Sequence, residues 1–251
     1  MPHFFIKSSM VNSGLILLED KENYNHIAKS LRARIGESLL LIDEQRIQYE
    51  TVIEDITTTS IRCRIEKSYF SNRDLEFNLY LAQSPLRSDA QSFVIEKATE
   101  LGVRGVIPIM TDNCALNQVQ IAKKIERWQR LMYESSKQCE RAVIPKCEGL
   151  SSIDNLCKSG RFDKIFAFCE REAEKTFREY FLNSPIIKGE NILVIIGPEG
   201  GFSNSEFTYF EELSIPKLTL GNMILRAETA VTVALGNIVY EYENFGKNKI
   251  R

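Results

Sequence analysis

The stretch NILVIIGPEGGFSNSEF, residues 191–207, decides the fold of the chain. It begins with an unbroken apolar run, which is typical of a strand buried on both faces. Pro198 and the glycines of GPEGG then predict a tight turn in which the backbone can approach a ligand closely. Ser203 and Glu206 have the spacing of a capping box, so a helix is expected directly after the turn. The stretch therefore predicts a strand, a ligand-facing turn and a helix in succession.

The same alternation of strand and helix patterns extends over the chain from Leu75 onwards. Apolar runs predict strands at 76–81, 105–110, 164–169, 191–196 and 217–220. Helical patterns are found at 89–101, 118–140, 170–182, 204–213 and 227–242. This order is typical of an α/β fold in which helices cover both faces of a mainly parallel sheet. Ligands of such folds bind beyond the carboxyl ends of the strands, which points to the turn at 197–201.

The N-terminal part of the chain follows a different pattern. Short β-type runs lie at 15–19, 38–44, 48–56 and 60–67, with one helical stretch at 23–31. In the last of these runs apolar and charged residues alternate, so one face of that strand is expected to be buried. We therefore predict a small β-barrel with a boundary within 67–74, which divides the chain into domains at 1–72 and 73–251.

The composition is that of an ordinary globular protein, with 43% hydrophobic and 26% charged residues among 251. No apolar run approaches the roughly 20 residues that cross a bilayer, and the N-terminus has no pattern of a secretion signal. A cytoplasmic protein without a membrane partner is therefore expected. The six cysteines contain no CxxC pair and there are only two histidines, so neither a metal site nor a disulfide framework is expected.

The net charge of −2 does not by itself indicate nucleic-acid binding, because contacts with phosphate groups need positive charge at the binding surface. Between residues 118 and 146, however, seven Lys or Arg residues stand against three acids. Such a run is compatible with a basic, phosphate-binding helix face and equally with a solvated face that binds nothing.

A second glycine-punctuated stretch, LTLGNMILRAETA at residues 218–230, follows the last predicted strand. Arg226 lies among apolar residues directly before the last predicted helix, where a cation is unfavourable without a partner. Glu228 falls in the first turn of that helix, where its charge stabilises the helix dipole. Neither stretch is a nucleotide-binding motif, because no GxGxxG opens a helix and no Lys-Ser/Thr follows the glycines. The second stretch is thus a candidate functional loop.

Together, IGPEGGFSNSEF and LGNMILRAETA resemble the two C-terminal signature segments of the RsmE family, SPOUT-class methyltransferases that act on N3 of a uridine in 16S ribosomal RNA. EKATELGV at 96–103 and SSKQCERAVIP at 135–145 resemble further segments of that family. MPHFF at the N-terminus and NHIAKSLRARIGE at 25–37 resemble the opening of its PUA-like RNA-binding domain. The resemblance covers nearly the whole chain. It implies a PUA-like β-barrel followed by a SPOUT domain with a C-terminal trefoil knot, an exception to the rule that chains do not thread themselves.

The resemblance also implies a cofactor, partners and site residues. S-adenosylmethionine would be the methyl donor, 16S rRNA of the small ribosomal subunit the substrate, and a homodimer would complete each site without a metal. The implied cofactor pocket consists of Gly197, Glu199, Gly201, Leu220, Gly221, Ile224, Leu225 and Ala230. The candidate RNA contacts are Arg32, Arg34, Arg87, Lys137, Gln138 and Arg141.

Three residues are candidates for catalysis at the methyl-transfer centre. We expect Arg226 to donate hydrogen bonds to a uracil oxygen and thereby stabilise developing negative charge. Either Glu228 or Glu199 would accept the proton of N3, since no histidine lies near the two loops.

Four positions depart from the family pattern. Arg is usual where Met223 stands, Thr where Ala227 stands and His where Asn25 stands, and His3 occupies a position that is more often Arg. Three other functions are compatible with the sequence: another SPOUT enzyme such as a tRNA ribose methylase, a non-catalytic RNA-binding assembly factor, and an enzyme that binds phosphate at the GPEGG turn. The pairing of the two C-terminal segments favours the rRNA base methyltransferase.

Overall fold

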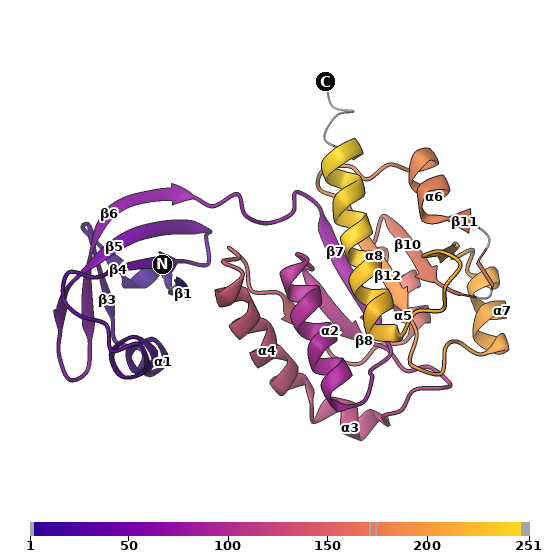
Figure 1. The fold of residues 1–251 in the computed structure, drawn as a ribbon, viewed down its shortest axis with the longest axis horizontal. Helices are drawn as coiled ribbons and strands as arrows, with labels where there is room; N and C mark the ends of the chain where they lie inside the picture. Colours follow the sequence, from indigo (N-terminus) through magenta and orange to yellow (C-terminus); the bar gives the residue numbers. More distant parts are fainter. Residues whose placement is uncertain (1–2, 171, 174, 247–251) are drawn as a thin grey trace. The chain divides into compact units, whose positions relative to one another are not determined.

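The computed structural model describes residues 3–170, 172–173 and 175–246. Met1 and Pro2 of the MPHFF segment, and residues 171 and 174 within the helix predicted at 170–182, lie outside the described residues. Contacts within the chain form two compact units, one of residues 1–74 with 136–143 and one of residues 75–135 with 144–251 (Figure 1). The predicted domain boundary between residues 72 and 73 differs from this division chiefly in the segment 136–143, and it stays a prediction.

A six-stranded sheet with the order β1–β4–β5–β6–β3–β2 forms the first unit. Its elements are β1 (His3–Phe5), η1 (Ser8–Met10), β2 (Val11–Asn12), β3 (Leu15–Leu18), α1 (Lys21–Tyr24), η2 (Asn25–Ser30), β4 (Ser38–Ile42), β5 (Ile47–Ile56) and β6 (Ile61–Phe70). β1 and β4 are parallel, and the other neighbours are antiparallel. The predicted helical stretch is occupied by α1 and by the π-helix η2.

The alternation predicted for β6 is confirmed. Ile61 and Cys63 are fully buried, whereas Arg62 and Arg64 are exposed. Because successive side chains of a strand point to opposite faces, this pattern turns one face of the sheet toward the apolar core of the unit. The predicted small N-terminal β-domain is thus confirmed as a largely antiparallel sheet. Among the described residues, β1 and β2 are the two edge strands of this sheet and do not pair with each other. Backbone hydrogen bonds therefore do not close the sheet into the expected barrel.

Seven parallel strands form the sheet of the second unit, in the order β11–β13–β10–β12–β7–β8–β9. They are β7 (Asn78–Gln83), β8 (Gly105–Pro108), β9 (Lys146–Cys147), β10 (Lys164–Phe168), β11 (Lys175–Thr176), β12 (Asn191–Ile196) and β13 (Lys217–Thr219). The predicted α/β fold with a mainly parallel sheet is confirmed.

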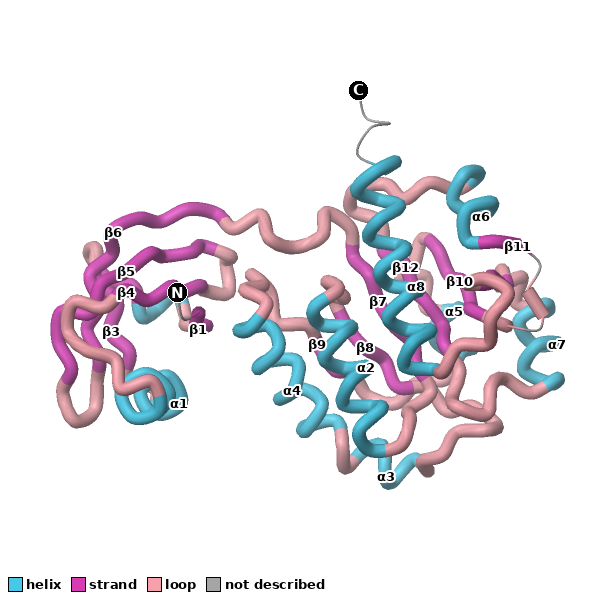
Figure 2. The backbone as a smooth tube through the Cα atoms, in the orientation of Figure 1, coloured by secondary structure: helices cyan, strands magenta, loops and turns pink. Residues whose placement is uncertain are grey.

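Both faces of this sheet are buried, as the unbroken apolar run of β12 predicts. Ile192, Val194 and Ile196 belong to one core, and Leu193 and Ile195 belong to the other. The first core is covered by α2 (Ser88–Glu100), α3 (Gln118–Ala122), α4 (Ile125–Gln138), α6 (Phe177–Asn183), α8 (Ala227–Glu241) and η3 (Tyr242–Gly246), and the second by α5 (Ile153–Lys158) and α7 (Asn204–Glu212). Figure 2 shows these helices flanking the strands.

The first unit contains β1, η1 and β2, which were not predicted, and the second unit differs from the predicted elements in three further respects. The helix predicted at 118–140 is two helices, because α3 ends before Lys123 and α4 begins at Ile125. The helix predicted from residue 170 begins at Phe177, after a capping box between Thr176 and Glu179. The elements β9, β11 and α5 were not predicted, since strands of two residues and a helix of six are too short to show a period.

The strand order explains how the two glycine-punctuated loops meet. In the sheet, β10 lies between β12 and β13. The chain therefore passes from β12 over β10 to β13, and α7 forms this connection. It then returns through residues 220–226 to α8, which packs against β12 and against α2 (Figure 1). The loops after β12 and β13 therefore lie at the same edge of the sheet. The trefoil knot implied by the resemblance stays a prediction.

Gly102 follows the end of α2 with a φ of +87°, and a Cβ there would lie 2.8 Å from Leu75 Cγ. We expect Gly102→Ala to lower the free energy of unfolding by about 2–3 kcal/mol, because it combines backbone strain with overpacking. Gly160 is a matched control: it follows α5 with a φ of +64° and has nothing within 4 Å of a Cβ. Gly160→Ala should therefore cost only about 1 kcal/mol in urea denaturation. Equal losses would show that Leu75 is not involved.

His3 is buried in β1 with 5% of its surface exposed. Neither ring nitrogen has a hydrogen-bond partner within the part of the chain that the structure describes. Burial, with a smaller contribution from the positive charge of Arg73, lowers the pKa of His3 from 6.5 to about 4. The imidazole is therefore neutral in the folded protein at pH 7.

This burial predicts a loss of stability in mild acid. Because the pKa of His3 is lower in the folded than in the unfolded chain, its contribution is complete above about pH 6.5 and is lost as the pH falls toward 4. At pH 5 the loss should be about 2 kcal/mol, measurable by amide hydrogen exchange in β4. His3→Phe should remove this part of the pH dependence, and His26→Phe should leave it in place. An unaltered pH dependence in His3→Phe would contradict the assignment.

Candidate functional site

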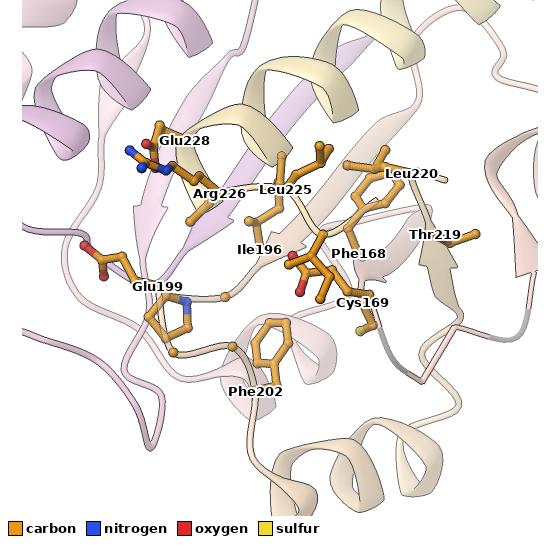
Figure 3. Close-up of a pocket in the computed structure, with 18 of the residues that line it drawn as sticks. Phe168, Cys169, Ile196, Glu199, Phe202, Thr219, Leu220, Leu225, Arg226 and Glu228 are labelled. Atoms are coloured by element: carbon orange, nitrogen blue, oxygen red, sulfur yellow. The ribbon is translucent and has the colours of Figure 1, made fainter. Parts of the chain in front are cut away.

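A cavity of about 600 Å³ lies at the carboxyl ends of β10, β12 and β13, beside the start of α8 (Figure 3). Its volume falls in the range of roughly 300–1,000 Å³ that is usual for small-molecule sites. The lining comes from residues 168–170 after β10, the turn at 196–202, the loop at 219–225 and the start of α8, with Ala90 of α2 and Phe207 of α7. The cavity is thus where parallel α/β sheets usually bind ligands.

The turn after β12 forms one wall of the cavity. Gly201 has a φ of +69°, and its N–H donates to the carbonyl of Pro198 (3.0 Å), which closes the turn. At Gly197 a Cβ would lie 3.2 Å from the ring of Phe202, so a larger residue would displace this aromatic side chain. The predicted capping box of Ser203 is confirmed, and α7 begins directly after it.

The loop between β13 and α8 forms a second wall. Gly221 has a φ of +128°, and its N–H donates to the hydroxyl of Thr219 (3.1 Å) while its carbonyl accepts from that hydroxyl (2.9 Å). Met223 and Ile224 follow with exposed fractions of 79% and 69%. Arg226 is the N-cap residue of α8, so the loop delivers its side chain at the start of the helix.

The charged side chains that Figure 3 labels lie on one side of the cavity. Arg226 and Glu228 extend from the start of α8 on the side where Glu199 also lies. Phe168 and Leu220 lie on the other side, near the ends of β10 and β13. The cavity therefore offers an apolar compartment beside a cation and the carboxylates of Glu199 and Glu228, and Glu170 adds a third carboxylate to its lining.

Glu199 is oriented by a hydrogen bond to a neighbouring loop. Its Oε1 accepts from the backbone N–H of Arg87 (3.0 Å). Arg87 is the N-cap residue of α2 and makes no side-chain cap of its own, so Glu199 satisfies an N–H at the start of that helix. This bond ties the turn after β12 to the loop after β7.

The structure brings together the two signature segments. Every residue predicted for the cofactor pocket lines the cavity, and so do Arg226 and Glu228. The predicted RNA contacts lie elsewhere, apart from Arg87, whose backbone binds Glu199 and whose side chain is exposed. The functions of all these residues stay predictions.

The remaining candidate RNA contacts differ in exposure. Arg32 and Arg34 are exposed in the first unit, and Gln138 is exposed at the end of α4. Lys137 is half-buried, with its Nζ 3.4 Å from Nδ1 of His26.

Arg141 is placed differently from the other candidates. Its side chain and that of Asp74 are each 5% exposed, and they form an ion pair with an N–O distance of 2.7 Å. Breaking a buried pair is strongly unfavourable, so Arg141 has a structural role in the first unit. Its phosphate contact stays a prediction that would require this pair to open.

Sequence analysis overlooked the contribution of β10. Phe168, Cys169 and Glu170 line the cavity from its carboxyl end, and Phe202 and Phe207 add aromatic surface. The signal was present, since a strand was predicted at 164–169 and ligands bind beyond such strand ends. What this loop lacks is the glycine that marks the other two.

Within residues 3–170, 172–173 and 175–246, no group of three or more His, Cys, Asp or Glu residues is arranged to hold a metal ion. In the same ranges, no helix has the length and apolar character to traverse a bilayer. All six cysteines are among the described residues, and none forms a disulfide.

Two family models match the chain. One, described as an RNA methyltransferase domain, covers residues 73–239, and one described as an RNA methyltransferase PUA domain covers residues 18–66. The first range contains every segment that lines the cavity.

Individual known proteins are similar over almost the full chain. The ribosomal RNA small subunit methyltransferase E of Buchnera aphidicola is 27% identical over 238 residues, which cover 94% of this chain and 91% of that protein. The protein of the same name from Bacillus subtilis is 27% identical, with 88% and 89% covered. A Legionella pneumophila protein described as a methyltransferase, solved with bound S-adenosylmethionine, is 26% identical with a TM-score of 0.81, and 94% of this chain and 96% of that chain are covered.

Proposed function

Because the chain belongs to the RNA methyltransferase family, we propose that it transfers a methyl group from S-adenosylmethionine to N3 of a uridine in the 16S rRNA of the small ribosomal subunit. The observation that carries the proposal is the cavity between the two glycine-punctuated loops, where an apolar compartment adjoins Arg226 and the carboxylates of Glu199 and Glu228. The names of the full-length relatives support the substrate, and the Legionella structure supports the methyl donor. An rRNA substrate would also place the enzyme in the cytoplasm.

The residues of the cavity suit this methyl donor. S-adenosylmethionine supplies an electrophilic methyl group on a positively charged sulfur. The apolar side with Phe168, Leu220 and Leu225 would bind the adenine ring, and Gly197 and Gly221 leave the backbone open to close approach. A pocket that excludes water favours a transfer in which that positive charge is neutralised.

Arg226 has a defined task in the proposed reaction. N3 of uridine is a weak nucleophile while it carries its proton, and loss of the proton spreads negative charge onto O2 and O4. We assign to Arg226 the donation of hydrogen bonds to one of these oxygens, which stabilises the anion. The bond from N3 to the methyl carbon forms as the bond from sulfur to that carbon breaks.

The N3 proton needs an acceptor. Three carboxylates line the cavity, those of Glu170, Glu199 and Glu228, and the last two lie on the side of Arg226. Glu199 already accepts the N–H of Arg87 and fixes the turn after β12. Glu228 lies beside Arg226, in the first turn of α8, on the side of the cavity that would face the uracil (Figure 3). We therefore assign the proton acceptor to Glu228 and a positioning role to Glu199.

Exposed basic side chains would bind the rRNA backbone. Arg32 and Arg34 belong to the unit that matches the RNA methyltransferase PUA domain, and Arg87 lies exposed at the start of α2. The expected homodimer is part of the same proposal, because Met223 and Ile224 form exposed apolar surface at the cavity that a second protomer would cover.

Methyl transfer from labelled S-adenosylmethionine tests the function directly. The purified chain should label small ribosomal subunits or free 16S rRNA, and mass spectrometry of the product should identify 3-methyluridine. A 2′-O-methylated nucleoside would instead support a SPOUT ribose methylase. Binding of the donor without any transfer would support a non-catalytic assembly factor.

The same reaction tests Arg226 and the two carboxylates. Arg226→Ala should lower kcat about 100-fold while the Kd for S-adenosylmethionine is nearly kept, because the guanidinium acts on charge that develops in the transition state. Glu228→Gln should lower kcat at least about 100-fold, whereas Glu199→Gln should act mainly on donor affinity. Arg178→Ala, on the exposed surface of α6, is the control. Unchanged turnover in Arg226→Ala would remove it from the mechanism.

Salt dependence of RNA binding tests the phosphate contacts. Arg34→Gln and Arg87→Gln should each reduce the slope of log K against log salt concentration by about 0.7–0.9, since each removes one phosphate contact. Arg178→Gln removes the same charge from α6 and should leave the slope unchanged. Slopes equal to that of the unmodified chain would exclude Arg34 and Arg87 from the RNA interface.

A further inference from the structure

The glycine turn that lines the cavity needs restraint from outside. Within GPEGG, the bond from the Gly201 N–H to the Pro198 carbonyl closes the turn. Glycine loses more conformational freedom on ordering than any other residue, so a wall rich in glycine is intrinsically soft. Its shape depends on the groups that hold it from neighbouring loops.

Asn113, in the loop after β8, provides part of that restraint. Its Nδ2 donates to the carbonyls of Gly200 (3.3 Å) and Gly201 (3.1 Å). A Cβ at Gly200 would lie only 3.0 Å from the Cβ of Asn113. The φ of Gly200 is outside the left-handed region, so the close approach of Asn113 is what requires a glycine at this position.

Asp112 holds the next part of the same segment. Its Oδ2 accepts from the hydroxyls of Ser203 and Ser205, the second at 3.0 Å. Its backbone N–H donates to Glu206 Oε1 (3.1 Å), while Oε2 of Glu206 accepts the Ser203 N–H (2.8 Å). The bonds from Ser203 and Ser205 lower the pKa of Asp112 below its ordinary value, because they stabilise the charged carboxylate.

The loop that carries these two residues is itself anchored. The Oγ1 of Thr111 lies 2.7 Å from the Oγ of Ser84, and both side chains are buried at the ends of β8 and β7. The loop that contains Asp112 and Asn113 is therefore attached to the parallel sheet through the contact between Thr111 and Ser84. Neither Asp112 nor Asn113 lines the cavity.

We propose that Asp112 and Asn113 are positioning residues for donor binding: they hold residues 197–203 in the shape that lines the cavity and so set the affinity for S-adenosylmethionine without touching it. This inference rests on the proposed function, because it takes the cavity to be the donor site. Preorganisation of a binding wall raises affinity by removing the loss of conformational freedom on binding.

The full-length chain and four substitutions test the proposal. Asn113→Ala removes both amide bonds, and the isosteric Asn113→Asp in addition places a carboxylate against two carbonyl oxygens. Asp112→Ala removes the acceptor, whereas Asp112→Asn keeps one acceptor oxygen in the same volume. Calorimetry should give a Kd for S-adenosylmethionine raised about tenfold in Asn113→Ala and Asp112→Ala, more in Asn113→Asp and less in Asp112→Asn.

The kinetic constants distinguish a positioning role in donor binding from a general loss of folded, active enzyme. The KM for the donor should rise with the Kd, while kcat at saturating donor and the KM for RNA stay near their original values. Asp154→Asn is the matched control, since Asp154 Oδ1 accepts from the hydroxyl of Tyr209 in α7 (2.5 Å) but lies away from the turn. This control should leave the donor KM unchanged.

Amide hydrogen exchange of the free protein gives a measurement that does not depend on the donor. Exchange at residues 199–203 should be faster in Asn113→Asp and Asp112→Ala than in the original chain or in Asp154→Asn. Original donor affinity and original exchange in folded variants would overturn the inference. Failure of the unmodified chain to bind S-adenosylmethionine would overturn the proposed function, while the exchange result would still decide whether the turn is held as described.

Discussion

Burial of β12 on both faces is the constraint from which the site follows. Because Val194 and Ile195 each point into a different core, the strand can meet a ligand only at its ends, and in parallel α/β sheets ligands bind at the carboxyl end. The neighbouring strand β10 then separates β12 from β13, so the chain has to cross it and come back to reach α8. That path places the turn after β12 and the loop before α8 against one cavity, although α7 and β13 separate them in the sequence.

The cavity divides its chemistry between these two loops. The loop before α8 supplies Arg226 and Glu228 from the start of a helix, where the backbone is regular and their positions are well defined. The turn after β12 supplies glycine backbone and Glu199, and other loops hold it through Arg87 and Asn113. In the proposed function the wall at the start of α8 carries the reacting groups, whereas the glycine turn keeps its shape only through the loops after β7 and β8.

Periodicity and turn chemistry were sufficient to predict the main strands, the parallel sheet and the capping box at Ser203, because these features are local or repeat over many residues. Short elements such as β9 and α5 left no pattern, and Phe168 was overlooked because no glycine marks the end of β10. The burial of Arg141 against Asp74 could not be predicted, since the two are far apart in the chain and a charged residue in a basic run is ordinarily exposed. Sequence patterns therefore located the loops of the site. They did not show which charged side chains are buried in the folded protein.

The cavity collects residues from Ala90 in α2 to Ala230 in α8, so its two walls are the products of distant parts of the chain. A ribosome that synthesises this protein releases α2 and the early strands long before the last helix exists, and domains fold in that N-to-C order. A nascent chain consequently lacks a complete donor pocket until translation is almost finished. Because the start of α8 lines the cavity, binding of the methyl donor there, as proposed, requires that the C-terminal helix is already in place.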